Sequence, residues 1–210
     1  MSTIQPTEVI NTAKTQGQGL LIVLSGPSGA GKGTLCKELV AAVPNLHVSV
    51  SATTRPPRRG EVNGKHYYFV SDQEFAALLQ ENKLLEYAEY CGKYYGTPQS
   101  EVEKAINTGK DIILEIEIQG ALKVKEKFPH GIFIFIVPPS LDELAARISK
   151  RGTESQAAIR QRLTQASREL EYVSEYDYVV VNDKIETAVE KLKAILTAEK
   201  CKVKRRKIKF

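Results

Sequence analysis

A glycine-rich loop between an apolar run and a helical stretch restricts the folds open to this chain more than any other feature. Residues 19–25 read GLLIVLS, and residues 26–35 read GPSGAGKGTL. The apolar run is typical of a buried parallel strand, and residues 32–43 have helical spacing. A loop in this position presents successive backbone N–H groups and a helix N-terminus to an anion. The three segments together predict a strand, loop and helix that bind phosphate.

The loop departs from the common phosphate-binding pattern at one position. In that pattern, G-x-x-x-x-G-K is followed directly by Ser or Thr, whose hydroxyl reaches a magnesium ion. Here Gly33 follows Lys32, and the hydroxyl comes one residue later, at Thr34. We expect Lys32 to supply a mobile positive charge for the terminal phosphates. The residues expected to bind the nucleotide phosphates are Gly26, Ser28, Gly29, Ala30, Gly31, Lys32, Gly33 and Thr34.

Strands and helices alternate along the rest of the chain. Further strands are predicted at residues 46–51, 84–90, 93–95, 111–120, 131–137 and 176–182, and helices at 74–83, 101–107, 157–172, 185–199 and directly after Ser140. Ser71 and Glu74 are predicted to form a capping box at the start of the first of these helices. This alternation predicts an α/β fold with a parallel sheet covered on both faces. In the predicted strand 111–120, Ile112, Leu114, Ile116 and Ile118 share one face, so Glu115 and Glu117 share the other.

One domain is predicted over residues 19–200, after a flexible leader at 1–18 and before a basic tail at 201–210. Two stretches fit its core poorly, because residues 52–98 are rich in Tyr and short strands and residues 139–170 are helical and rich in Arg. We expect both to hang over the C-terminal edge of the sheet, where ligands of such folds bind. The predicted core consists of residues 19–51, 99–138 and 171–200.

Composition excludes several classes of function. The tail carries a charge of +6 against +5 for the whole chain, so the remaining residues carry −1 and do not indicate a nucleic-acid-binding fold. No apolar run approaches the roughly 20 residues of a membrane helix. The three cysteines are scattered, without metal-ligand spacing, and the N-terminus lacks an apolar signal region. We therefore expect a cytoplasmic protein without a structural metal site.

A second stretch has the chemistry of a phosphate site. Residues 49–70 read SVSATTRPPRRGEVNGKHYYFV. Arg55 and Arg58, held beside prolines, can present planar guanidinium groups to a phosphate. Tyr67 and Tyr95 can add hydroxyl donors to the same phosphate. From these residues alone, a solvated basic loop remains the alternative.

This stretch closely resembles the nucleoside-monophosphate-binding segment of guanylate kinases. The resemblance continues through EYAEYCGKYYGTP, LEIEIQGA, KRGTE and VNDK, and covers nearly all of residues 20–198. It implies a P-loop NTPase-type parallel sheet flanked by helices, with residues 52–98 as an inserted small nucleoside-monophosphate-binding subdomain and residues 139–170 as a helical lid. The implied reaction transfers the γ-phosphoryl group of ATP to GMP, with Mg²⁺, giving GDP and ADP. Use of dGMP and a homo-oligomeric state are left open.

The resemblance also implies roles for particular residues. Glu86 matches a guanine contact and can accept from N1–H and the exocyclic amine, while Thr97 can donate to O6. Asn182 and Asp183 match the region near the donor adenine. The implied GMP-binding residues are Ser51, Arg55, Arg58, Tyr67, Glu86, Tyr95, Gly96, Thr97 and Glu117. The implied catalytic residues are Lys32, Arg55, Arg147, Arg151 and Arg162.

The metal ion is expected to be held through phosphates and water, with Thr34 and Glu117 as candidate protein ligands. Glu117 stands where the family usually has Asp, so we hypothesise that its longer side chain compensates for the hydroxyl absent at Gly33. The GKGT spelling is common in adenylate-kinase-like enzymes, which leaves a related kinase with another acceptor as one alternative. A second alternative is a non-catalytic guanylate-kinase-like module that binds phosphopeptides. Such modules typically have degraded phosphate loops, whereas Lys32 is present here.

Overall fold

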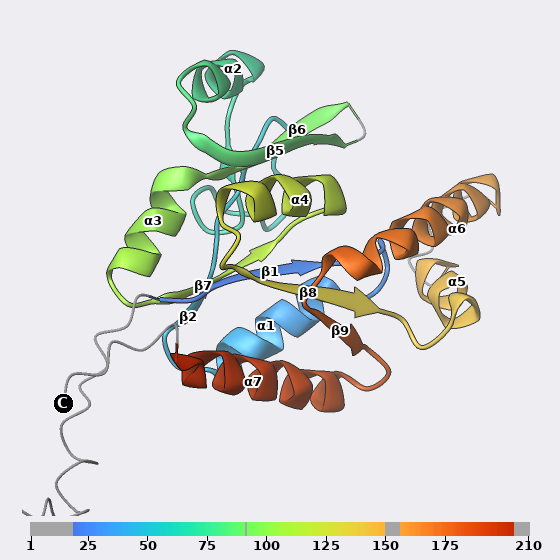
Figure 1. Ribbon diagram of the computed structural model, residues 1–210. Coiled ribbons are helices and arrows are strands. Elements are labelled where there is room, and N and C mark those ends of the chain that lie inside the picture. Colours follow the sequence, from blue (N-terminus) through green and yellow to red (C-terminus); the bar gives the residue numbers. More distant parts are fainter. Residues whose placement is uncertain (1–18, 91, 150–155, 204–210) are drawn as a thin grey trace, which may run out of the picture.

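Two sheets organise the chain. The computed structural model describes residues 19–90, 92–149 and 156–203, so the predicted leader and most of the predicted tail lie outside the described residues. A five-stranded parallel sheet has the order β2-β7-β1-β8-β9, and a four-stranded sheet has the order β4-β3-β6-β5 (Figure 1). The larger sheet consists of β1 (Leu21–Ser25), β2 (Leu46–Val48), β7 (Asp111–Glu115), β8 (Ile132–Val137) and β9 (Tyr178–Val181).

The smaller sheet and the helices complete the fold. Its strands are β3 (Ala52–Thr53), β4 (Tyr68–Phe69), β5 (Leu84–Tyr90) and β6 (Lys93–Pro98). The helices are α1 (Lys32–Ala42), α2 (Asp72–Gln80), α3 (Gln99–Asn107), α4 (Ile118–Lys127), α5 (Leu141–Ser149), α6 (Gln156–Leu170), a 3₁₀ turn (Glu171–Glu175) and α7 (Ile185–Cys201). None of the helices within the described residues is long and apolar enough to cross a membrane.

Helices cover both faces of the larger sheet, as the sequence predicts. Along β1, Ile22 and Leu24 pack with residues of α1 and α7. Leu21 and Val23 face the opposite way and pack with residues of α3 and α4. All five residues of β1 are buried, because each face of a central parallel strand is covered.

The predicted strand 111–120 is wrong in its second half. β7 ends at Glu115, and α4 begins at Ile118 with Glu117 as its N-cap residue. Ile112, Leu114 and Ile116 do pack in one cluster, as predicted. The Ile–Glu alternation continues past the end of the strand, which hides the helix. The helical signal lies further on, in the good helix formers of residues 121–127.

The smaller sheet has its own apolar cluster. Phe75 of α2 packs with Ala52 of β3 and Leu84 of β5. Ser71 and Glu74 form the predicted capping box at the start of α2. Figure 1 shows this sheet and α2 beyond α4, away from the larger sheet, while α5 and α6 lie beyond the end of β8. The C-terminal ends of β1 and β7, at Ser25 and Glu115, therefore lie near both residues 52–98 and residues 139–170, the two segments predicted to fit the core poorly.

Candidate active site

The glycine loop follows β1 and has a backbone that requires glycine. Gly29 and Gly31 have φ angles of +93° and +89°, which L side chains rarely adopt. A Cβ at Gly26 would lie 2.1 Å from the carbonyl oxygen of Ile136. Gly31 is the N-cap residue of α1, and because it has no side chain it does not cover the first N–H groups of the helix. The loop has the geometry of an anion site at a helix N-terminus.

Two polar side chains stabilise the loop. The Lys32 ammonium donates to the carbonyl oxygens of Gly26 at 2.5 Å and Pro27 at 3.2 Å. The Asn182 amide donates to the carbonyl oxygen of Ala30 at 2.7 Å. Asn182 is buried, whereas its neighbour Asp183 is exposed. Asn182, predicted near the donor adenine, therefore contacts the loop itself.

Two of the three arginines predicted in the lid, Arg147 and Arg162, lie within the described residues. The Arg147 guanidinium donates to the backbone oxygen of Asn182 at 3.1 Å and to Glu143 at 2.9 Å. Because Asn182 supports the loop, α5 brings Arg147 close to it. Arg162 is half-buried on α6. Arg151 lies outside the described residues, so its implied catalytic role stays a prediction.

A cavity of about 180 Å³ brings most of the predicted acceptor residues together. It lies between strands of the smaller sheet and the segment that follows β7. Its lining residues are Ser51, Tyr67, Glu86, Ala88, Tyr95, Glu115, Ile116 and Glu117. Gly96 and Thr97 lie beside it on β6, where Thr97 pairs with Glu86 of β5. Residues far apart in the sequence therefore form one pocket.

Glu86 is the buried carboxylate of this pocket, with 5 % of its surface exposed. Burial raises its pKa above the usual range, nearby Glu117 adds to the rise, and the Thr97 hydrogen bond and the charge of Lys123 oppose it. The Thr97 hydroxyl donates to Oε1 of Glu86 at 2.7 Å. A hydroxyl has one proton to donate, so Thr97 here orients Glu86. Its predicted donation to guanine O6 stays a prediction.

Arg55 is held in a fixed orientation by a residue that the sequence reasoning missed. Its two terminal nitrogens each donate to a Glu61 oxygen at 2.9 Å. Its guanidinium also lies over the rings of Tyr67 and Phe69, 5.4 and 5.7 Å from their centroids. The bond from Arg55, with a second from the backbone N–H of Arg58, lowers the pKa of Glu61 to about 2. A carboxylate thus binds the planar group that we predicted would bind phosphate.

Glu61 carried no periodic signal, because it lies in an irregular loop. Its only sequence cue is an acidic side chain six residues after an arginine in a basic segment. The side chain of Arg58 is exposed, and in this structure Arg58 contacts Glu61 through its backbone.

Glu115, the last residue of β7, and Glu117, the N-cap residue of α4, differ in their surroundings. Both carboxylate oxygens of Glu115 lie 3.5 Å from the position that a Cβ on Gly33 would take. Burial raises the pKa of Glu115, and Lys32 partly opposes this. Glu117 instead accepts from the backbone N–H of Gly120 at 3.2 Å, at the start of α4. Glu115 therefore lies beside Gly33, whereas Glu117 caps α4, and the hypothesis that Glu117 compensates for the hydroxyl absent at Gly33 stays a prediction.

Comparison with known proteins identifies the family of this chain. The model of the guanylate kinase family matches residues 18–199. The chain belongs to the guanylate kinase family. It is 66 % identical over 195 residues to a guanylate kinase of Desulfitobacterium hafniense (strain Y51), covering 93 % of this chain and 98 % of the relative. It is 58 % identical over 190 residues to a guanylate kinase of Caldanaerobacter subterraneus subsp. tengcongensis, covering 90 % and 92 %.

A solved structure agrees with the sequence relatives. The crystal structure of guanylate kinase from Anaplasma phagocytophilum matches with a TM-score of 0.76 and 36 % identity, covering 92 % of each chain. The resemblance and the fold class inferred from the sequence are confirmed. The curated relatives are named guanylate kinases and match over nearly all of their length, so the chain is a nucleotide-binding kinase and an enzyme.

Proposed function

We propose that the chain transfers the γ-phosphoryl group of ATP to GMP, giving GDP and ADP. The observation that carries this proposal is the pocket formed by Ser51, Tyr67, Glu86, Tyr95 and Glu117 beside a complete glycine loop. A loop for one nucleotide and a separate pocket with a buried carboxylate suit a reaction between two nucleotides. The proposal extends to the division of the chain into an acceptor-binding insertion at 52–98 and a lid at 139–170.

ATP is proposed to bind at the glycine loop. The phosphates would accept hydrogen bonds from the loop N–H groups, and the Lys32 ammonium would turn from the carbonyl oxygens of the loop to the phosphates. The Asn182 amide donates to the carbonyl oxygen of Ala30 in the loop, and Asp183 follows Asn182 in the chain.

Mg²⁺ fits this site as an ion held mainly by its substrate. No group of three or more His, Cys, Asp or Glu side chains able to hold a metal occurs among the described residues. Mg²⁺ commonly binds through phosphates, water and one or two carboxylates. Glu115, beside Gly33, is the proposed carboxylate, with the Thr34 hydroxyl one residue further. When bound, the ion neutralises negative charge on the phosphates.

GMP is proposed to bind in the pocket. Glu86 would accept from guanine N1–H and the exocyclic amine, a pair of donors that adenine does not present. Arg55, Arg58, Tyr67 and Tyr95 would bind the monophosphate, which competes with Glu61 for the Arg55 guanidinium. The remaining proposed contacts are Ser51, Gly96, Thr97 and Glu117.

The reaction requires positioning and charge neutralisation rather than acid–base chemistry. The acceptor phosphate oxygen is already an anion near neutral pH, so no general base is needed. Lys32 and Arg55 begin to neutralise the two polyanions, and closure of the lid would add Arg147, Arg151 and Arg162. Closure also excludes water, which would otherwise hydrolyse ATP.

ADP formation with GMP, dGMP, AMP, CMP and UMP as separate acceptors tests the proposal. With ATP and Mg²⁺ present, GMP should support turnover and AMP should support little. Turnover with AMP in preference to GMP would refute guanine selection by Glu86. Binding of GMP without turnover on any acceptor would refute the proposed reaction.

A further inference from the structure

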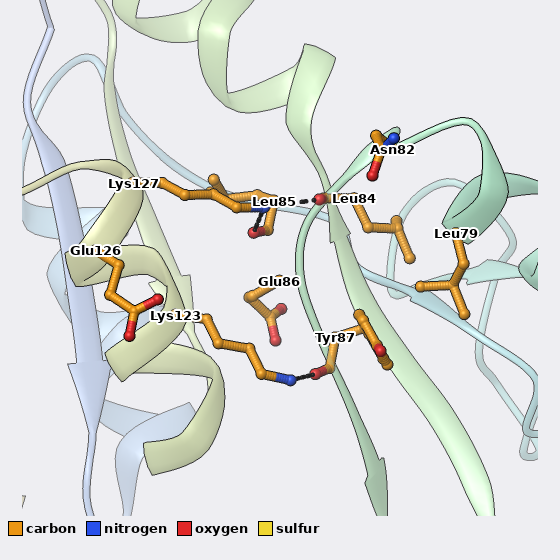
Figure 2. Close-up of a pocket in the computed structure, with 9 residues that line it drawn as sticks. All are labelled: Leu79, Asn82, Leu84, Leu85, Glu86, Tyr87, Lys123, Glu126 and Lys127. Carbon is orange, nitrogen blue, oxygen red and sulfur yellow. Dashed lines mark hydrogen bonds between the residues drawn. The ribbon is translucent and has the colours of Figure 1, made fainter.

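One face of α4 lies against β5, the strand that carries Glu86. Gly120, Lys123 and Lys127 are spaced by three and four residues, so they form a stripe on one side of the helix. Figure 2 shows Lys123 and Lys127 reaching from α4 to β5 on either side of Glu86. We name these three residues the α4 stripe.

The two lysines bind backbone carbonyl groups of an edge strand. Lys127 donates to the carbonyl oxygens of Leu85 at 2.7 Å and Leu84 at 3.4 Å. Lys123 donates to the carbonyl oxygen of Tyr87 at 2.9 Å and lies 4.4 Å from the centre of its ring. Among the described residues, β5 is the edge strand of its sheet and pairs with β6 alone, so carbonyl groups on its outer edge have no strand partner there. The lysines supply partners immediately before and after Glu86.

The backbone that Lys127 binds is irregular. The pairing of β5 with β6 shifts register between Leu84 and Glu86, as it does at a β-bulge. Bulges change the direction in which the following side chain points. Because Lys127 contacts the two carbonyl groups at this shift, it stabilises the backbone that directs Glu86 into the pocket.

Gly120 provides the space for the carboxylate itself. A Cβ at this position would lie 2.5 Å from Oε2 and 3.1 Å from Cδ of Glu86. Gly120 does not have a positive φ angle, so its backbone would accept an L residue. Alanine also favours helices over glycine. The requirement for glycine at position 120 is therefore the close approach of Glu86.

We propose that the α4 stripe positions Glu86 and so determines selectivity for guanine over hypoxanthine. This inference rests on the proposed function. Hypoxanthine, the base of inosine monophosphate (IMP), keeps N1–H but lacks the exocyclic amine. A displaced Glu86 carboxylate loses both hydrogen bonds to guanine but only one to hypoxanthine, so the preference for GMP over IMP falls.

The test compares Gly120→Ala, Lys123→Met and Lys127→Met with the control Lys125→Met. Lys125 is on the same helix but donates to the backbone oxygen of Glu175, away from β5. Steady-state kinetics with GMP and with IMP at saturating ATP are measured for each variant, together with the KM for ATP and the melting temperature. Gly120→Ala and Lys127→Met should each lower kcat/KM for GMP about tenfold or more, the loss expected for a hydrogen bond to a charged group.

Four readouts separate positioning from a general structural role. The loss should arise mainly in the KM for GMP, the GMP-to-IMP ratio should fall, the KM for ATP should stay constant, and Lys125→Met should behave as wild type. Equal losses for GMP and IMP, or no loss in any stripe variant, would overturn the inference while the wild type still makes GDP. Failure of the wild type to make GDP would overturn the proposed function itself, and the inference with it.

Discussion

Replacement of Glu86 by Gln isolates the charge of the buried carboxylate. The side chain keeps its size, and the remaining oxygen can still accept from Thr97, which lies 2.7 Å from Glu86. An amide, however, presents one acceptor and one donor where the carboxylate presents two acceptors. Of the two hydrogen bonds proposed from guanine N1–H and the exocyclic amine to Glu86, one is lost in the variant. The amide N–H group of the Glu86→Gln side chain then faces an N–H group of guanine.

The size of the effect follows from these two changes. Loss of a hydrogen bond to a charged group costs about 1.5–3 kcal/mol, and an unpaired buried donor costs about 1–3 kcal/mol. Together these values predict a fall of roughly 10²- to 10⁴-fold in kcat/KM for GMP. The KM for ATP should change little, because the glycine loop is a separate site.

Stability should respond in the opposite direction. Burial raises the folded-state pKa of Glu86 above its unfolded value, so ionisation at neutral pH disfavours the folded state. Glu86→Gln removes this cost and should melt at the same temperature as the wild type or higher. The difference in melting temperature should be largest at neutral pH. It should shrink as the pH falls through the raised pKa, where Glu86 becomes protonated in the folded protein, towards the unfolded-state value of 4.5.

The assay is ADP formation with GMP and with AMP, alongside thermal melting at several pH values. The reasoning is refuted if Glu86→Gln leaves kcat/KM for GMP unchanged. It is refuted equally if activity falls only in proportion to a loss of folded protein, since the charge would then act through stability.

Three further predictions concern the phosphate and metal regions. Arg55→Lys removes the planar guanidinium group that makes two hydrogen bonds to Glu61. It should raise the KM for GMP by about 10- to 100-fold, with little change in the KM for ATP. An equal change in both KM values would contradict a role of Arg55 in acceptor binding. Gly31→Ala places a Cβ on a residue with a φ of +89°, and this Cβ would lie 2.4 Å from Nδ2 of Asn182. The variant should have a free energy of unfolding lower by about 1–3 kcal/mol, measured by urea denaturation. It should also bind ATP more weakly, measured by ATP titration. Glu115→Gln should raise the Mg²⁺ concentration needed for half-maximal rate more than Glu117→Gln does, and the reverse order would favour Glu117 as the carboxylate that compensates for Gly33.

Local chemistry in the sequence determined the parts of this protein that depend on neighbouring residues. The strand, loop and helix around residues 26–35 were predicted correctly because an apolar run, closely spaced glycines and a following helix form one continuous unit. The capping box of Ser71 and Glu74 was predicted for the same reason, since its two partners are three residues apart. The family was likewise recognisable from short motifs in chain order.

The tertiary structure decided the contacts between distant segments. Glu115 and Glu117 look equivalent in an alternating pattern, but the end of β7 places one beside the glycine loop and the other at the start of α4. Lys123 and Lys127 of α4 bind carbonyl groups of β5, 36 and 42 residues away in the sequence, and no local pattern indicates these contacts. Hydrophobic periodicity reports which face of an element is buried, but not which element covers it. For this reason the sequence could name candidate residues of the site, but not the geometry in which they lie.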